Sequence, residues 1–335
     1  MTRSTLPHAN RRSSSLALYR REVSVAGAIA LLGVVLGFAA PGYFSRANLG
    51  DLFLANLPVL IVALGATLIV VSGEIDISVG SVFAVCSVLS GIAAKTGLPM
   101  PAVMLVVLLA GAALGAINGA LVAHLRLPSI VVTLATMVIL REGLRWLTQG
   151  AWVQDLPAGY QWLGLSQGAY PIAALLVSGG LFAAMGWSAA HLAAGRAIYA
   201  TGSNPDAARL AGFDTGFVKW AVFTGAGALT GLAALLNSVR FNQIPSNAGL
   251  GLEMKVIAAV IVGGTAIRGG RGTFVGTLLG VILLGAIGPA LTFLGVNAYW
   301  ERAIQGAIIL TAVAVDAWRQ RPPTHARALA AGAGA

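Results

Sequence analysis

Residues 101–124 read PAVMLVVLLAGAALGAINGALVAH, a long apolar run that contains no Asp, Glu, Lys or Arg. A helix of about 20 apolar residues is long enough to cross the hydrocarbon core of a bilayer. Gly111, Gly115 and Gly119 recur in this run at a spacing of four, which places them on one helical face. Small residues at this spacing let helix backbones approach closely in membranes. The run therefore predicts a closely packed transmembrane helix.

Further apolar runs precede and follow this one, separated by Pro, Gly and charged residues that end or kink helices. Together they predict an all-α, polytopic transmembrane helical bundle of about ten spans, at residues 23–41, 52–72, 77–94, 101–124, 128–147, 170–193, 217–239, 253–267, 273–295 and 302–317. The runs at 77–94 and 253–267 are short for a full crossing. We expect these two to be tilted, broken or re-entrant.

The composition of the whole chain supports this interpretation. Of 335 residues, 57% are hydrophobic and only 10% are charged, and the mean hydropathy is +0.84. A soluble domain carries about 25% charged residues. The net charge of +10 comes mainly from basic residues at the chain ends and in short loops. That distribution favours the positive-inside pattern of membrane proteins over a nucleic-acid-binding surface. The single cysteine, Cys86, has no partner for an internal disulfide.

The chain ends predict the topology. Arginines precede the first apolar run as in a signal peptide, but no small-residue cleavage site follows, so we expect a retained first helix. An even number of spans puts both ends on one side, and the arginines near both ends place that side in the cytoplasm. We therefore expect cytoplasmic tails at residues 1–22 and 318–335 around a transmembrane domain at 23–317.

The loop at residues 194–216, AGRAIYATGSNPDAARLAGFDTG, carries a complete set of helix signals. Asn204 is suited to cap a helix that begins at Pro205 and Asp206, and Gly212 is suited to end it. A helix of two turns is unstable alone in water, so we expect it to dock against a partner. The alternative is an ordinary interfacial loop.

Four segments of the chain, in order, resemble one known family. They are GEIDISVGS at 73–81, NGALVAHLRLPSIVVTLATM at 118–137, GRAIYATGSNPDAARLAGF at 195–213 and GLEMKVIAAVIVGGTAIRGGRGTFVGTLLG at 251–280. They are similar to segments of ABC-type sugar permeases of the ribose, arabinose, xylose, rhamnose and autoinducer-2 group. The resemblance covers most of the chain from about residue 50 to residue 316. Glu74 stands where the family usually has Gly, which leaves its role open.

The resemblance implies the partners. Permeases of this family work with a cytoplasmic ATP-binding subunit, a periplasmic solute-binding protein and a second permease copy or paralogue. It also implies an ATPase-coupling segment within residues 195–216, comprising Gly202, Asn204, Asp206, Ala207, Ala208, Arg209, Leu210, Gly212 and Phe213. The signature residues of the family correspond to Gly73, Glu74, Asp76, Ser78 and Gly80.

The sequence lacks the phosphate loop G-x-x-x-x-G-K-[ST], so we expect ATP to bind the partner subunit and this chain to be a transport subunit rather than an enzyme. We expect no cofactor of its own. It also shows no metal-binding or catalytic motif. The expected location is the bacterial inner membrane, as a multi-pass protein.

Several polar residues lie within or between the apolar runs. Glu74 and Asp76 are two residues apart and do not share a helical face, which argues against a paired-carboxylate site. We expect Asp76 or Ser78 to cap the third helix, with a transport role as the alternative. Candidates for the solute pathway are Asn118, Thr133, Thr136, Asn242 and Asn247. Hydrogen bonds between helices or a simple turn are the alternative roles for these five.

Residues 150–170 contain Trp152, Tyr160 and Trp162, which predict an interfacial aromatic belt, with contact to the binding protein or a gate as the alternative. The predicted function is import of a monosaccharide or sugar-like solute of the rhamnose, ribose or autoinducer-2 type. Two alternatives stay open: an ion-gradient-driven secondary transporter, and an ABC permease for branched-chain amino acids. The sequence also leaves open whether the permease forms a homodimer or a heterodimer.

Overall fold

A computed structural model describes residues 12–40, 42–297 and 299–319, and the elements that it forms there are helices, joined by turns and by one isolated β-bridge. The helices are α1 (Arg12–Ala39), α2 (Arg46–Val71), α3 (Val79–Lys95), α4 (Met100–Ala123), α5 (Ser129–Thr148), the short η1 (Gln161–Gly164), α6 (Tyr170–His191), α7 (Ala193–Ser203), α8 (Pro205–Leu210), α9 (Thr215–Ser238), α10 (Leu252–Val262), α11 (Phe274–Phe293) and α12 (Trp300–Arg319).

Each of the ten predicted apolar runs contains one of these helices. Among the described residues, six helices are long and apolar enough to cross a membrane: α1, through its Glu22–Ala39 part, and α2, α4, α6, α9 and α11. α3 is shorter, with 17 residues, and α10 has only 11. An 11-residue helix rises about 16 Å, which is half of the roughly 30 Å hydrocarbon core. The chain is a polytopic helical membrane protein in which two helices are too short for a simple crossing.

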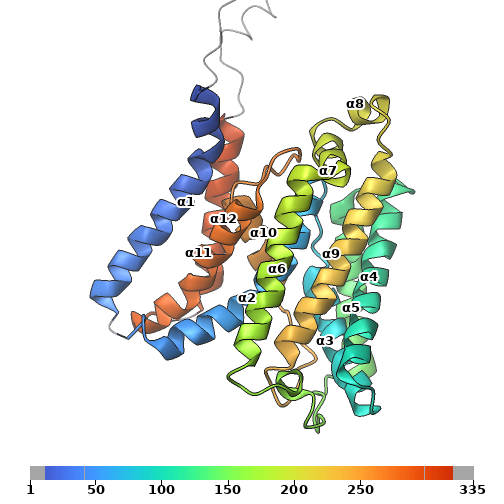
Figure 1. Cartoon of the computed structure of the whole chain (residues 1–335), viewed down its shortest axis with the longest axis vertical. Helices are drawn as coiled ribbons and strands as arrows, with labels where there is room; N and C mark the ends of the chain where they lie inside the picture. The colour runs from blue at the N-terminus through green and yellow to red at the C-terminus, as the bar shows by residue number, and fades with distance from the viewer. Residues whose placement is uncertain (1–11, 41, 298, 320–335) are drawn as a thin grey trace, which may run out of the picture.

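The first and last helices continue past residues 23 and 317 into the predicted tails. α1 begins at Arg12, so part of the expected N-terminal tail at 1–22 is helical, and α12 continues to Arg319. The remaining parts of the two predicted tails lie outside the described residues. The start of α1 and the end of α12 lie at the same end of the molecule as α8 (Figure 1).

The predicted glycine face of α4 packs against α9. A Cβ atom on Gly111 would lie 2.3 Å from the carbonyl oxygen of Gly227, and one on Gly115 would lie 2.2 Å from that of Phe223. No side chain larger than hydrogen fits at these distances, so the glycines allow the two backbones to touch. α2 lies beside this pair and is buried along most of its length from Leu57 onward, which makes it the central helix of the bundle.

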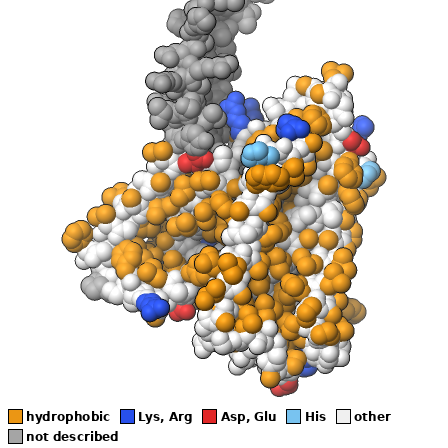
Figure 2. Space-filling model, in the orientation of Figure 1, with side chains coloured by type: hydrophobic (Ala, Val, Ile, Leu, Met, Phe, Trp, Pro, Cys, Tyr) orange, Lys and Arg blue, Asp and Glu red, His pale blue; other side chains and the backbone are white. Residues whose placement is uncertain are grey.

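The surface agrees with a bilayer environment. Apolar side chains cover much of the face seen in Figure 2, and the charged side chains on that face gather towards its ends. Large apolar residues are exposed along several helices, among them Leu109 on α4, Ile139 on α5 and Leu176 on α6. A surface of this kind is stable when lipid covers it.

The aromatic residues of 150–170 do not form one belt. Trp152 is exposed, but Tyr160 is fully buried, and its hydroxyl lies 2.6 Å from Ser90 Oγ on α3. Trp162 packs against Tyr170, with 5.2 Å between ring centroids. The interfacial interpretation is therefore wrong for Tyr160, because this segment folds back into the bundle and its hydroxyl finds a buried partner there.

Candidate transport and coupling site

Residues 72–78, which connect α2 to α3, form a polar break inside the bundle. The Asp76 carboxylate is buried and accepts hydrogen bonds from Ser78 N at 2.8 Å and from Ser78 Oγ at 2.6 Å. Asp76 thus bonds the backbone N–H of the residue that precedes α3, rather than an N–H of the first turn of the helix. Ser78 holds the N-cap position itself, without a side-chain capping bond.

α4 and α5 hold this break through a connected set of hydrogen bonds. Asn118 Nδ2 on α4 donates to Ser78 Oγ at 2.9 Å, and Thr136 Oγ1 on α5 donates to Asn118 Oδ1 at 2.7 Å. One turn away, Thr133 Oγ1 lies 2.8 Å from Ser129 O and 3.4 Å from Ile75 O. Three of the candidate pathway residues and two signature residues therefore meet in one place. We name Asp76, Ser78, Asn118, Thr133 and Thr136 the inner network.

Glu74 forms an ion pair with Lys219 on α9. The two side chains are 13% and 22% exposed, so the pair is largely withdrawn from water. The role of Glu74, which the sequence left open, is therefore to pair with a base on a distant helix. A clue was present, because an acid beside an apolar span needs a base close to it. The pair connects the α2–α3 break to α9.

The end of α7 is locked to the end of α2 by a contact made of backbone. Gly270 N donates to Val71 O at 2.8 Å, and a Cβ atom on Gly202 would lie 1.8 Å from the same oxygen. A Cβ atom on Gly269 would lie 2.7 Å from Cα of Gly73. Gly73, Gly269 and Gly270 all have positive φ, which L-residues with side chains rarely adopt. We name this contact of Val71, Gly73, Gly202, Gly269 and Gly270 the glycine junction.

Tyr199 on α7 adds a side-chain bond beside the glycine junction. Its hydroxyl donates to Gly272 O at 2.7 Å. Burial raises the pKa of Tyr199, so the hydroxyl keeps the proton that this bond requires. The loop with residues 268–272 thus packs against α7. Neither α7 nor this contact is predicted from the sequence.

α8 is the predicted capped helix, and it projects from the end of the bundle (Figure 1). Asn204 Oδ1 accepts from the backbone of Asp206 and Ala207 at 3.1 and 3.0 Å, and Gly212 follows with φ of 86°. Arg209 lies 3.0 Å from both Asp206 Oδ1 and Thr215 Oγ1.

The side chains of α8 divide into a packed and a free side. Ala208 is buried and Phe213 is half-buried, but Leu210 is 92% exposed. An isolated, fully exposed leucine at the tip of a short helix is a natural contact point for another protein.

α10 is the second helix that begins inside the bundle. A Cβ atom on Gly80, in the first turn of α3, would lie 2.1 Å from Glu253 Oε2 and 2.7 Å from Gly249 O. Glu253 stands in the first turn of α10, and Gly251, with φ of 84°, precedes that helix. The starts of α3 and α10 therefore meet, with Gly80 as the point of contact.

Asn242 and Asn247 lie in the connection from α9 to α10 and stand apart from the inner network. Both are exposed. Asn242 lines a cavity of about 300 Å³ together with Trp152, Phe241 and Pro245. The structure thus divides the five candidate pathway residues into two groups in different parts of the molecule.

A bundle with exposed apolar helices, two interior helix starts and one projecting helix is the architecture of a membrane transport subunit. Comparison with known proteins agrees with this class. The family model of the branched-chain amino acid transport system / permease component matches residues 48–313. The chain therefore belongs to that permease family.

Named relatives are similar over nearly the whole chain. The autoinducer 2 import system permease protein LsrC of Enterobacter sp. (strain 638) is 35% identical over 315 residues, covering 93% of this chain and 91% of the relative. The protein of that name from Photorhabdus luminescens is 35% identical over 302 residues, covering 88% and 89%. The one from Escherichia coli (strain K12 / DH10B) is 36% identical over 298 residues, covering 88% and 86%. No solved structure gives a significant match.

These relatives confirm the resemblance to ABC-type sugar permeases of the autoinducer-2 group that the four motifs indicated. The chain is a transport subunit and a multi-pass protein of the inner membrane.

Proposed function

We propose that this chain is the membrane-spanning permease subunit of an ATP-binding-cassette importer, and that its solute is autoinducer-2 or a close sugar-like analogue. The names of the relatives support this solute. The observation that carries the coupling role is the projecting α8, with Leu210 exposed and its supporting helix α7 locked to the α2–α3 break.

The partners follow from this role. A cytoplasmic ATP-binding subunit docks on residues 195–216, with Leu210 as the contact and Phe213 beside it. A periplasmic solute-binding protein delivers the solute at the opposite end, and a second permease chain completes the membrane part. ATP binds the partner subunit.

The glycine junction supplies the path by which docking moves the membrane helices. Displacement of α8 and α7 acts on Gly202, whose backbone touches Val71 at the end of α2. Because no flexible side chain lies between these backbones, little of the movement is absorbed. The displacement then reaches α3 through the α2–α3 break, and it reaches α9 through the Glu74–Lys219 pair. This rigid route suits alternating access driven by ATP.

We further propose ten membrane-embedded helices, with α3 and α10 entering only part of the bilayer, and both chain termini in the cytoplasm with α8. The arginines near the chain ends support this orientation. Labelling of α8 by a membrane-impermeant reagent in inside-out but not right-side-out vesicles is the expected result.

The test of coupling is Leu210→Asp in the assembled transporter. Because Leu210 is exposed, the variant folds and inserts normally, and we expect the ATP-binding subunit to co-purify at less than a tenth of the wild-type amount. Leu165→Asp is the matched control, since Leu165 is also exposed but lies in the segment between α5 and α6. Equal retention of the ATP-binding subunit by both variants contradicts docking at α8.

The test of solute and energy source is uptake of labelled autoinducer-2 by cells that contain the full transporter. We expect uptake to persist with a protonophore while ATP is maintained and to be unaffected by excess L-leucine. Collapse with the protonophore indicates an ion-gradient-driven carrier, and competition by L-leucine indicates an amino-acid permease.

A further inference from the structure

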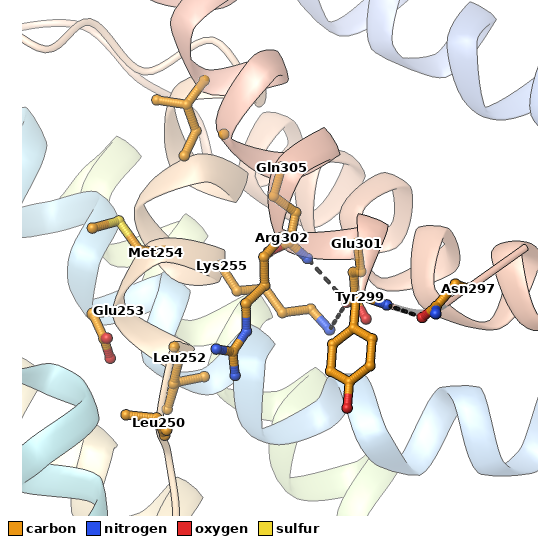
Figure 3. A pocket seen from close by; sticks show the side chains of 13 residues that line it. Leu250, Leu252, Glu253, Met254, Lys255, Asn297, Tyr299, Glu301, Arg302 and Gln305 are labelled. Carbon is orange, nitrogen blue, oxygen red and sulfur yellow. Dashed lines mark hydrogen bonds and ion pairs between the residues drawn. The ribbon is translucent and has the colours of Figure 1, made fainter.

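A cavity of about 850 Å³, lined by both charged and apolar side chains, lies between the start of α10 and the start of α12 (Figure 3). Its lining includes Glu253 and Lys255 from α10 and Glu301, Arg302 and Gln305 from α12. Binding sites for small molecules in proteins have volumes of about 300–1,000 Å³. This cavity, which we name the α10–α12 cavity, is therefore large enough for a small solute.

One face of α12 builds the wall of the α10–α12 cavity. Arg302, Gln305, Gly306 and Ile309 all line it. Their spacing of three, four and seven residues from Arg302 places them on a single helical face. Ala307 is exposed and does not line the cavity, so it marks the other face of the helix.

The polar groups in the cavity are partly paired. Lys255 Nζ lies 4.0 Å from Glu301 Oε1, and Gln305 Nε2 donates to the same oxygen at 3.0 Å. Figure 3 shows both side chains directed towards Glu301, with Arg302 and Tyr299 beside them. Glu253 Oε2 is buried and has no hydrogen-bond partner among the described residues. The Lys255 ammonium carries three N–H donors, and its contact with Glu301 is long, so donor capacity remains for a ligand.

The charged side chains of the cavity are partly accessible, since those of Lys255 and Glu301 are 23% and 30% exposed. Charged groups in a membrane domain face a bundle interior or a water-filled space, because contact with lipid is costly. Transporters bind solutes where discontinuous helices begin inside the bundle, and α10 begins there.

The formal charges of the cavity balance. Glu253 and Glu301 contribute two negative charges, and Lys255 and Arg302 contribute two positive charges. A solute with net charge would leave its charge uncompensated in a partly dry space. Hydroxyl groups both donate and accept, so they match a lining of carboxylates, amide and cationic donors.

We infer that the α10–α12 cavity is a solute-contacting site of the transport pathway and that it takes an uncharged, hydroxyl-rich small molecule. This inference rests on the proposed function and adds the residues that contact the solute. Gln305, Lys255 and Glu301 bind its hydroxyls, and Arg302 closes the side of the cavity next to Gly251.

The first experiment measures access to the cavity by cysteine labelling in the complete transporter. Gly306→Cys places a thiol in open space on the cavity wall, since nothing lies within 4 Å of a Cβ atom there. Ala307→Cys is the matched control one residue along the same helix. The natural Cys86 is fully buried and adds little background.

We expect a hydrophilic, membrane-impermeant thiol reagent to label Gly306→Cys at least tenfold faster than Ala307→Cys. We expect autoinducer-2 to slow that labelling several-fold and L-leucine to leave it unchanged. Equal labelling rates for the two variants overturn the inference. So does the absence of protection by autoinducer-2 in a transporter that takes it up.

The second experiment measures uptake kinetics of Glu301→Gln and Lys255→Met. We expect KM for autoinducer-2 to rise about tenfold in each variant. Wild-type KM in both variants overturns the inference. If the wild-type complex takes up no autoinducer-2, the proposed solute is wrong, and the cavity is then judged on the Gly306→Cys labelling rate alone.

Discussion

α3 and α10 both begin inside the bundle and meet at Gly80, but their polar surroundings differ. At the start of α3, Asp76, Ser78 and Asn118 bond to one another, and the inner network is closed. At the start of α10, the α10–α12 cavity opens beside Lys255 and Glu301, whose side chains are 23% and 30% exposed. A satisfied network fixes backbone position, whereas free donors and acceptors are available to a ligand. The start of α3 therefore has a positioning role, and the start of α10 has the proposed binding role.

The largest expected effect is at the glycine junction that anchors the α3 side. In Gly202→Val, the new Cβ atom would lie 1.8 Å from Val71 O, which is backbone and cannot turn aside. We expect a loss of at least about 3 kcal/mol of stability, at the upper end of overpacking costs. Thermal unfolding in detergent measures it.

Gly225→Val is the control for this substitution. Nothing lies within 4 Å of a Cβ atom at Gly225, which is exposed on α9. A stability close to wild type is expected. Similar losses in both variants mean that the junction has no special role.

The second-largest loss of stability is expected at the Glu74–Lys219 ion pair. Lys219→Met leaves the Glu74 carboxylate largely buried without its base, and we expect a loss of about 2–3 kcal/mol, below the cost for a fully buried pair because some water reaches it. The double variant Lys219→Met with Glu74→Gln removes both charges and recovers most of this loss. Unfolding titrated with SDS measures the cycle. Additive losses contradict a direct interaction.

Asn118→Leu tests whether the inner network is a positioning element. It removes the acceptor for Thr136 and the donor to Ser78, and we expect a loss of about 2 kcal/mol through unsatisfied buried groups. Asn247→Leu is the control in the exposed connection before α10, where we expect a change within about 0.5 kcal/mol. Wild-type stability of Asn118→Leu with raised KM instead points to solute contact at Asn118.

The smallest effect on stability is expected in the α10 region. Glu253→Gln keeps the size of the side chain but removes a charge that has an unpartnered oxygen, so stability changes by less than about 1 kcal/mol. Transport is expected to fall several-fold because the cavity loses its charge balance. If Glu253→Gln loses stability but keeps wild-type uptake kinetics, the start of α10 has a positioning role rather than a binding role.

Much of this architecture is predictable from the sequence because its causes are local. Apolar runs define the helices, since every backbone polar group in lipid has to be bonded within its own segment. Asn204, Pro205 and Gly212 define α8 through bonds that span only a few residues. The glycine spacing of α4 predicts a packing face, although it does not identify α9 as the partner.

The tertiary structure decided what depends on distant neighbours. Glu74 and Lys219 are 145 residues apart, and Val71 meets Gly202 and Gly270 only because α2, α7 and the 268–272 loop end at one point. The burial of Tyr160 and the cavity between α10 and α12 also depend on how whole helices pack. Sequence by itself determined a helical membrane permease with a projecting helix, because those features arise from short-range periodicity and capping. Which polar groups are closed into a network and which stay open for a solute was decided only by packing, since hydrogen bonds in a low-dielectric interior depend on what lies within about 3 Å.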